Sequence, residues 1–190
     1  PTGSGKTLFA TMAIASVQRS SLIVVPTIDL LYQWKSVIEK SLSFSPGILG
    51  GGHKEIKSIT VATYESARLY IEKIGNMFGF IIFDECHHLP APHYQIIAKA
   101  SIAPFRLGLT ATVERADGGE KVIFDLLGPL VFEGNIRDLV ELSLSPYDVV
   151  TVEVELTELE RKNYNETRKC YLDFVREKKV NFSHPGAWKR

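Results

Sequence analysis

The chain has 190 residues, enough for one domain with a hydrophobic core and part of a second unit. Its 22 basic and 22 acidic residues give a formal net charge of zero, so any nucleic acid must be held by local groups and not by a bulk positive field. Apolar runs are too short for a membrane span, no signal peptide opens the chain, and two cysteines cannot build a disulfide framework. Membrane, collagenous and disulfide-scaffold proteins are therefore excluded, and we expect a reducing compartment: the cytoplasm, or the nucleus in a eukaryote.

Short β-branched apolar runs alternate with helical patterns through most of the chain. The runs predict buried strands at residues 22–25, 59–63, 80–83, 106–110 and 130–132. Apolar residues at helical spacing predict helices at residues 7–19, 28–40, 64–73, 93–100, 120–127 and 136–142. Strands that alternate with helices form right-handed crossovers, so the sequence predicts an α/β fold with a central parallel sheet flanked by helices.

The pattern changes after Pro146. Residues 147–156 alternate between apolar and polar types, which predicts a half-exposed connecting strand. Thr157 and Glu160 then form a capping box, followed by a helix with an apolar stripe and no partner for it. We therefore expect a domain over residues 1–145, a connecting strand over 146–156, and the start of a second unit over 157–190, in a fragment cut at both ends.

The net charge changes sign at the same boundary, between residues 156 and 157. Residues 1–156 hold 13 basic and 17 acidic residues, a net charge of −4, whereas residues 157–190 hold nine basic and five acidic residues, a net charge of +4. A basic helical segment of this kind suits a solvated surface and a nucleic-acid contact equally well.

The first seven residues match the second half of the phosphate-binding loop G-x-x-x-x-G-K-[ST]. Its residues are Thr2, Gly3, Ser4, Gly5, Lys6 and Thr7. The glycines let consecutive N–H groups point at phosphate oxygens, and the helix that follows adds its positive dipole end. Lys6 would reach the β- and γ-phosphates of ATP, and the Thr7 hydroxyl would bind Mg²⁺. A chance match in a flexible loop is the alternative.

Two carboxylates follow the apolar run at residues 80–83. The carboxyl ends of parallel strands form the ligand-binding edge of such a sheet, so Asp84 and Glu85 are predicted to lie beside the phosphate loop. Asp84 suits Mg²⁺, and Glu85 suits the orientation and deprotonation of the water that attacks the γ-phosphate. Lys6, Asp84 and Glu85 are therefore the predicted catalytic residues.

Cys86, His87, His88 and His93 also raise the question of a zinc site. Their spacing fits no closed zinc pattern, and His87 and His88 would point in opposite directions on an extended segment. Packed or hydrogen-bonded histidines are the favoured interpretation.

Five motifs together resemble those of the superfamily 2 helicases, and their residues are similar to those of the XPB-type DNA repair helicases of archaea. They are PTGSGKT (1–7), VPTIDLLYQW (25–34), TYES (63–66), DECHHLP (84–90) and LGLTAT (107–112). The resemblance covers residues 1–145 and implies the first of two RecA-like motor domains of the P-loop NTPase class. It also implies a second RecA-like domain in the same protein, DNA as substrate, and a nuclease as the candidate partner protein.

The resemblance implies further roles, each with a plainer alternative. His87 would link the nucleotide site to the facing domain, and Thr110 and Thr112 would couple hydrolysis to DNA movement, although both threonines also suit a strand end. The implied contacts to the DNA backbone, made without reading sequence, are Pro26, Thr27, Gly51, Thr63, Arg115 and Asp117. Thr27 is also predicted as the N-cap of the helix at 28–40, which is the plainer role, and the two roles can coexist. At Arg115 and Asp117 the family has an Arg-Glu-Asp element, and Ala116 here lacks its central carboxylate.

We therefore expect the motor domain of an ATP-dependent DNA helicase or translocase in nucleotide excision repair. The alternatives are the motor subunit of a restriction-type DNA translocase, a DNA- or partner-binding module that binds ATP without turnover, and a small-molecule kinase. The basic segment after residue 157 occupies the place of a thumb-like insertion in the family. Without a second domain to supply arginine fingers, residues 1–190 by themselves are expected to be nearly inactive.

Overall fold

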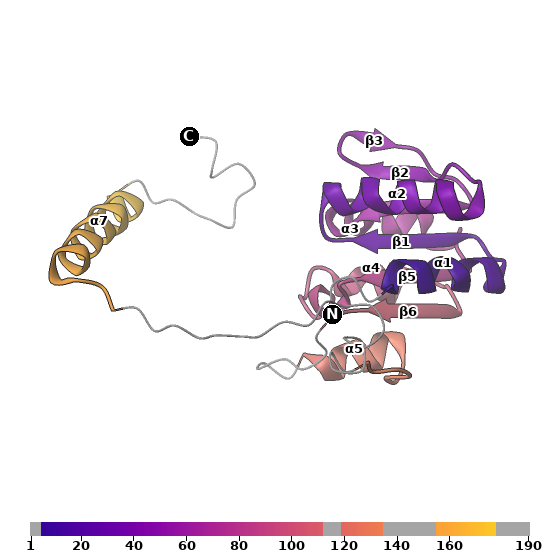
Figure 1. The fold of residues 1–190 in the computed structure, drawn as a ribbon. Coiled ribbons are helices and arrows are strands. Elements are labelled where there is room, and N and C mark those ends of the chain that lie inside the picture. The colour runs from indigo at the N-terminus through magenta and orange to yellow at the C-terminus, as the bar shows by residue number, and fades with distance from the viewer. Residues whose placement is uncertain (1–4, 112–118, 135–154, 178–190) are drawn as a thin grey trace. The chain divides into compact units, whose positions relative to one another are not determined.

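The computed structural model describes residues 5–111, 119–134 and 155–177 (Figure 1). The chain divides into two compact units, Pro1–Pro146 and Tyr147–Arg190. The first holds α1 (Lys6–Val17), β1 (Ser21–Val25), α2 (Ile28–Leu42), β2 (Gly47–Gly50), β3 (His53–Lys54), β4 (Ile59–Thr63), α3 (Tyr64–Ile74), β5 (Phe80–Asp84), the 3₁₀ turn η1 (Cys86–His88), α4 (Gln95–Ala100), β6 (Phe105–Leu109) and α5 (Glu120–Leu127). The second holds α7 (Glu158–Glu177).

Within these residues six strands form one sheet in the order β3-β2-β4-β1-β5-β6. Every neighbouring pair is parallel except β2 and β3, which are antiparallel. Val25 lies opposite Thr63, and Val24 lies opposite Phe83. The carboxyl ends of β1, β4 and β5 therefore meet at one edge, and the predicted α/β fold with a parallel sheet is confirmed.

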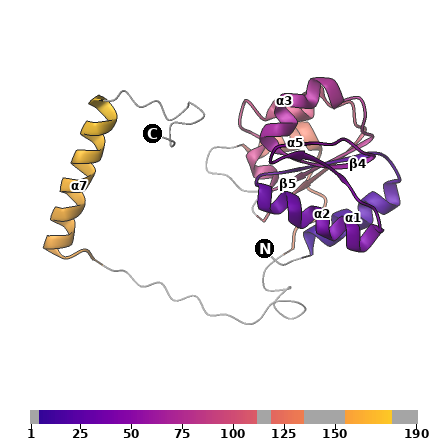
Figure 2. The same ribbon diagram turned by 90° about the horizontal axis from the view of Figure 1, so that it is seen from above.

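Helices cover both faces of the sheet and create two cores. Helices α1 and α2 lie on one face, and α3 and α5 lie on the other (Figure 2). The first core joins Ala10, Ile14, Trp34 and Ile38 to one set of strand side chains, and the second joins helix α3 to the alternate set. Strands buried on both faces explain why they read in the sequence as continuous apolar runs.

Most predicted elements are found within a few residues of their expected bounds. The strand at residues 59–63 and the helix at 120–127 match β4 and α5 fully. The strand predicted at 130–132 is wrong, because these residues form no ladder and Val131 and Phe132 are 85% and 81% exposed. An apolar run becomes a strand only where a neighbouring backbone accepts its hydrogen bonds.

The sequence did not predict strands β2 and β3. Three consecutive glycines join them, and Gly50, Gly51 and Gly52 all have positive φ angles of 150°, 59° and 89°. Glycine adopts such angles without steric cost, so this run forms a tight reversal between short strands. Glycines at both ends of β2 weaken its apolar signal, which is why the sequence pattern predicted no strand here.

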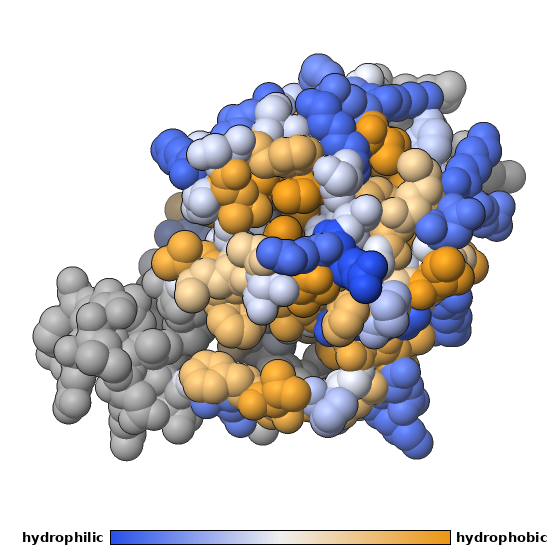
Figure 3. Space-filling model, turned by 90° about the vertical axis from the view of Figure 1, so that its right-hand side faces the viewer, coloured by the Kyte–Doolittle hydropathy of each residue, from blue (hydrophilic) through white to orange (hydrophobic). Residues whose placement is uncertain are grey.

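Figure 3 shows one face of the molecule, on which apolar and hydrophilic side chains are intermixed both near the middle and along the edges. Hydrophilic side chains are thus spread around this face and do not form one band. None of the helices in the described ranges is long and apolar enough to cross a membrane.

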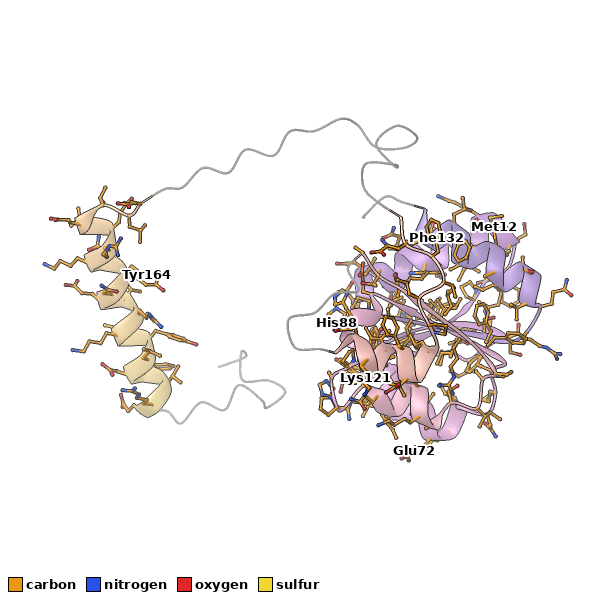
Figure 4. All side chains as sticks on the ribbon, turned by 90° about the horizontal axis from the view of Figure 1, so that it is seen from below. Met12, Glu72, His88, Lys121, Phe132 and Tyr164 are labelled. Atoms are coloured by element: carbon orange, nitrogen blue, oxygen red, sulfur yellow. The ribbon has the colours of Figure 1, made fainter. Side chains whose placement is uncertain are left out.

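Helix α7 begins with the predicted capping box. The Thr157 N–H donates to Glu160 Oε2 at 2.9 Å, and the Glu160 N–H donates to Thr157 Oγ1 at 3.3 Å. No residue of α7 is buried, and side chains such as Tyr164 project from it (Figure 4).

Within its bounds α7 carries five basic and five acidic residues, so the predicted basic excess falls in residues 178–190, outside the described residues. The predicted helix at 136–142 and most of the strand at 147–156 also fall outside them, and residues 155 and 156 are not in a strand.

Candidate functional site

The start of α1 lies towards the carboxyl edge of the sheet. The segment that follows the end of α1 lies beside the start of β5, because the Gly79 N–H donates to Ser20 O at 2.9 Å. A Cβ atom on Gly79 would also lie 3.1 Å from Arg19 Cβ. Helix α1 is about 18 Å long, and β5 is about 16 Å long. Because α1 packs along this strand (Figure 1), Lys6 lies at the end of α1 nearer Asp84.

The Asp84 side chain faces the same side of the sheet as α1. Phe80 and Ile82 belong to the core under α1 and α2, whereas Ile81 and Phe83 belong to the core under α3. Side chains alternate along a strand, so Asp84 shares the face of Phe80 and Ile82. The structure therefore brings the first residues of α1 and the Asp84 carboxylate to one edge and one face.

The Asp84 carboxylate is 6% exposed and accepts two hydrogen bonds. The Trp34 indole Nε1–H donates to Oδ2 at 2.7 Å, and the Glu85 backbone N–H donates to Oδ1 at 3.1 Å. The sequence pattern placed Trp34 in the motif at residues 25–34 and in the helix predicted at 28–40, but gave its side chain no role at the site. A buried indole N–H needs an acceptor, and that requirement was the available signal for this contact.

Glu85 has an unusual backbone conformation. Its φ and ψ angles of 49° and 54° lie in the left-handed region, which costs a residue other than glycine about 1–3 kcal/mol. Such angles concentrate at functional sites, where the surrounding structure holds them in place. The Glu85 side chain is 29% exposed and thus accessible to a small ligand.

His87 connects Glu85 to the end of β6. Its Nδ1 lies 3.3 Å from Glu85 Oε2 and 3.1 Å from Thr110 Oγ1. Two residues predicted to take part in coupling, His87 and Thr110, therefore contact each other beside the predicted base.

The interpretation that His87 and His88 point in opposite directions is wrong. Both residues lie in the 3₁₀ turn η1, and their ring centroids are 4.3 Å apart. A 3₁₀ turn replaces the extended segment that the prediction assumed, so the alternation of a strand does not apply. Across the described ranges, no three His, Cys, Asp or Glu side chains come together as a metal site.

Two buried groups near the acidic pair stay protonated. Burial, with smaller contributions from the nearby acidic groups, raises the pKa of Tyr64 well above its usual value. The Tyr64 hydroxyl donates to the Asp84 carbonyl oxygen at 3.1 Å. Burial likewise raises the pKa of the Cys86 thiol to about 12. A protonated thiol is a poor nucleophile, so Cys86 fills space at the site.

Three predicted DNA contacts come together at the carboxyl ends of neighbouring strands. Thr27 and Thr63 cap α2 and α3, because their Oγ1 atoms accept the backbone N–H groups of Leu30 and Ser66, each at 3.2 Å. A Cβ atom on Gly51 would lie 3.6 Å from Ile28 Cγ2 in the first turn of α2. Thr27 and Gly51 are exposed, whereas Thr63 is only 8% exposed.

Pro26 directly precedes this cap and is half-buried. Six other predicted site residues lie outside the described residues: Thr2, Gly3, Ser4, Thr112, Arg115 and Asp117.

The residues at this edge fit a magnesium nucleotide. Mg²⁺ prefers oxygen ligands. The buried Asp84 carboxylate faces the side of the sheet that holds α1, and Thr7 with its hydroxyl lies in the first turn of α1. The neutral indole of Trp34 orients that carboxylate without adding a competing positive charge. The N-terminus of α1 and the Lys6 ammonium together favour phosphate groups.

Comparison with known proteins bears on this site. Residues 1–115 match the family model described as type III restriction enzyme, res subunit. The chain is 46% identical over 175 residues to the DNA 3'-5' translocase XPB2 of Sulfurisphaera tokodaii, which covers 92% of this chain and 40% of that protein. It is 34% identical over 176 residues to the DNA 3'-5' helicase XPB of Kineococcus radiotolerans, covering 86% of this chain and 31% of that protein.

A solved structure shares the fold. The Hef helicase domain of Pyrococcus furiosus superimposes with a TM-score of 0.58 and 24% identity, covering 67% of this chain and 32% of that one. This chain spans about 40% of the length of the S. tokodaii protein. The family model covers more than half of the chain. The chain therefore belongs to the family described as type III restriction enzyme, res subunit; it is similar over most of its length to XPB-type proteins and shares its fold with the Hef helicase domain.

Proposed function

We propose that the chain is the first motor domain of an ATP-dependent DNA helicase or translocase of XPB type, acting in DNA excision repair. The observation that carries the proposal is the arrangement at the carboxyl edge, where the Asp84 side chain faces the side of the sheet on which α1 begins with Lys6 and Thr7, and Glu85 directly follows Asp84. A phosphate-binding helix start together with a magnesium-binding carboxylate and a base makes a phosphoryl-transfer site.

In this mechanism Lys6 neutralises charge on the β- and γ-phosphates of ATP, and Thr7 and Asp84 hold Mg²⁺. When bound, Mg²⁺ supplies further neutralisation of the phosphate charge. Glu85 orients the attacking water and accepts its proton, and the left-handed backbone at Glu85 sets where its carboxylate points. His87 and Thr110 contact each other and would transmit changes at the nucleotide site to the end of β6.

DNA would lie along the carboxyl edge that holds Thr27 and Gly51. Hydroxyl and backbone N–H groups bind phosphates without reading bases, which suits movement along any sequence. The second RecA-like domain of the same protein would close on this edge and supply arginine side chains to the γ-phosphate. A nuclease is the partner protein that a repair role would require.

The restriction-type alternative rests on the family description, whose model ends at residue 115. The XPB-type relatives match 86% and 92% of the chain and so include sequence beyond that point. This wider match favours the XPB-type assignment over a restriction subunit.

The test is Glu85→Gln in the full-length protein. We expect DNA-stimulated ATP hydrolysis to fall by about 10²- to 10⁴-fold, because a general base contributes on that order. Binding of a fluorescent ATP analogue should stay close to wild type, since glutamine keeps the shape of the side chain. A pure binding module would show no hydrolysis to lose.

Glu72→Gln is the matched control. Glu72 lies on α3, is exposed and points away from the domain (Figure 4). This variant removes the same charge from the same domain and should hydrolyse ATP at the wild-type rate. Equal rates in the Glu85 variant and wild type would refute the assignment of Glu85 as the base. A full-length protein without any stimulation by DNA would favour a small-molecule kinase.

A further inference from the structure

We propose that Trp34 is a positioning residue that holds the Asp84 carboxylate for Mg²⁺ and ties it to helix α2. The proposal rests on the proposed function, since it concerns the same nucleotide site. It deepens that function by giving a role to a side chain near the middle of α2, two turns beyond the predicted DNA contact at Thr27.

The contact between Trp34 and Asp84 is short and buried. Trp34 is 1% exposed, Asp84 is 6% exposed, and Nε1 lies 2.7 Å from Oδ2. A buried carboxylate is costly unless donors satisfy it, and a hydrogen bond to a charged acceptor is stronger than one between neutral groups. This bond therefore fixes the rotamer of Asp84.

The chemistry of the donor suits a metal site. The indole N–H is neutral and donates a single hydrogen bond, so it orients the carboxylate and leaves its negative charge for a cation. A lysine or arginine in the same place would pair with that charge and compete with Mg²⁺. Partners of metal-binding carboxylates act in this way, and their loss weakens metal binding about 10- to 100-fold.

A second bond holds the same residue from the opposite face of the sheet. The Tyr64 hydroxyl donates to the Asp84 carbonyl oxygen at 3.1 Å, and Tyr64 is 2% exposed. Trp34 belongs to the core under α1 and α2, whereas Tyr64 belongs to the core under α3. Asp84 is thus fixed through its main chain on one side and through its carboxylate on the other.

The bond to Trp34 also connects Asp84 to the start of α2. Thr27 caps α2, and Trp34 follows seven residues later, a distance of about 10 Å along a regular helix. Helix α2 is one unbroken element, so a shift of its first turn on phosphate binding moves the indole as well. Asp84, the proposed Mg²⁺ ligand, and Thr27, the predicted DNA contact, are therefore linked through helix α2 and the Trp34 hydrogen bond.

The experiment measures the Mg²⁺ requirement of the full-length protein. Two variants remove the donor: Trp34→Phe, and replacement of Trp34 by 3-benzothienylalanine, which keeps the indole shape with sulfur in place of N–H. Binding of N-methylanthraniloyl-ATP is titrated with Mg²⁺ and is also measured in EDTA. We expect the half-saturating Mg²⁺ concentration to rise about tenfold or more, with unchanged binding in EDTA.

Hydrolysis gives a second measurement. The half-saturating Mg²⁺ concentration for ATP hydrolysis should rise by the same factor, whereas kcat at saturating Mg²⁺ should change far less. DNA should lower the Mg²⁺ requirement of the wild-type protein and should lose that effect in both variants. A persistent effect of DNA in the variants, or none in the wild type, would overturn the link through α2.

Ile38→Ala is the control for lost packing. Ile38 lies on the same helix, in the same core, and is fully buried, but its apolar side chain cannot donate a hydrogen bond to Asp84. It should lower the thermal stability and leave the Mg²⁺ requirement unchanged. An equal change in the Ile38 variant, or a wild-type requirement in the benzothienyl variant, would overturn the role of Trp34. A wild-type protein that binds no nucleotide would instead refute the proposed function and this proposal with it.

Discussion

Thr27 caps helix α2 and is also a proposed contact to the DNA backbone. Its Oγ1 accepts the Leu30 N–H at 3.2 Å, and the residue is exposed. Aspartate and asparagine are equally good caps, but only aspartate would repel a phosphate group. We predict that Thr27→Asp binds single-stranded DNA about fivefold more weakly, which corresponds to about 1 kcal/mol for one exposed charge pair.

The two substitutions separate the cap from the DNA contact. Thr27→Asn should bind DNA like the wild type, and both variants should keep the wild-type melting temperature. Fluorescence anisotropy of a labelled oligonucleotide with the full-length protein measures the affinities. Equal DNA affinity in the Asp and Asn variants would show that no phosphate approaches Thr27.

The two cysteines differ in environment, although the sequence gives no sign of it. Cys86 is buried and Cys170 is exposed. With its pKa raised to about 12, the Cys86 thiol is almost fully protonated at pH 8, and the thiolate is the form that reacts. We predict that iodoacetamide at pH 8 alkylates Cys170 at least a hundredfold faster than Cys86.

Peptide mapping of the native protein by mass spectrometry follows both sites at once. Unfolding in urea is the control, and should bring the two rates close together because burial causes the difference. Fast alkylation of Cys86 in the native protein would mean that the turn at residues 86–88 opens readily.

At the scale of elements, the capping box of α7 couples helix formation to pH. Hydrogen bonds from the backbone and the side chain of Thr157 lower the pKa of Glu160. A pKa that is lower in the helix than in the unfolded chain stabilises the helix above the unfolded value, about 4.3. That stabilisation is lost as the pH falls through the lowered pKa.

A peptide of residues 155–177 tests this coupling, since α7 buries none of its residues. We predict that its helical circular dichroism signal at 222 nm falls as the pH drops from 6 to 2. The Glu160→Gln peptide keeps a capping side chain that does not titrate, so it should lose less signal over this range. Identical curves for the two peptides would contradict the role of the Glu160 carboxylate.

The elements show where pattern reading succeeds. Helix α2 was predicted from its apolar spacing and from Thr27 as its cap, and both are found. The strand at 130–132 failed under the same rules, because within the described residues no strand lies beside these apolar residues to complete a ladder. A helix satisfies its own backbone, whereas a strand depends on a neighbour that is remote in the sequence.

At the scale of the whole molecule, the site depends on the order of strands in the sheet. Strand β5 lies between β1 and β6, so Asp84 and Glu85 emerge beside the ends of both. This order brings Thr110, which directly follows β6, close to His87: its Oγ1 lies 3.1 Å from His87 Nδ1, across 23 residues of sequence. It also places the caps of α2 and α3 on the other side of the acidic pair, so the proposed nucleotide residues and the proposed DNA contacts share one edge of the sheet.

The amino-acid sequence by itself determined the α/β class, most helix and strand positions and the cap at Thr27, and it predicts that the phosphate loop pairs with Asp84 and Glu85. These features follow from local periodicity and from residue types that carry their own chemistry. Only the tertiary structure decided that Trp34 binds Asp84, that Glu85 adopts a left-handed backbone, and that His87 contacts Thr110. Each of these depends on contact between segments that are distant in the sequence or on a turn that packing imposes. No local sequence pattern encodes either of them.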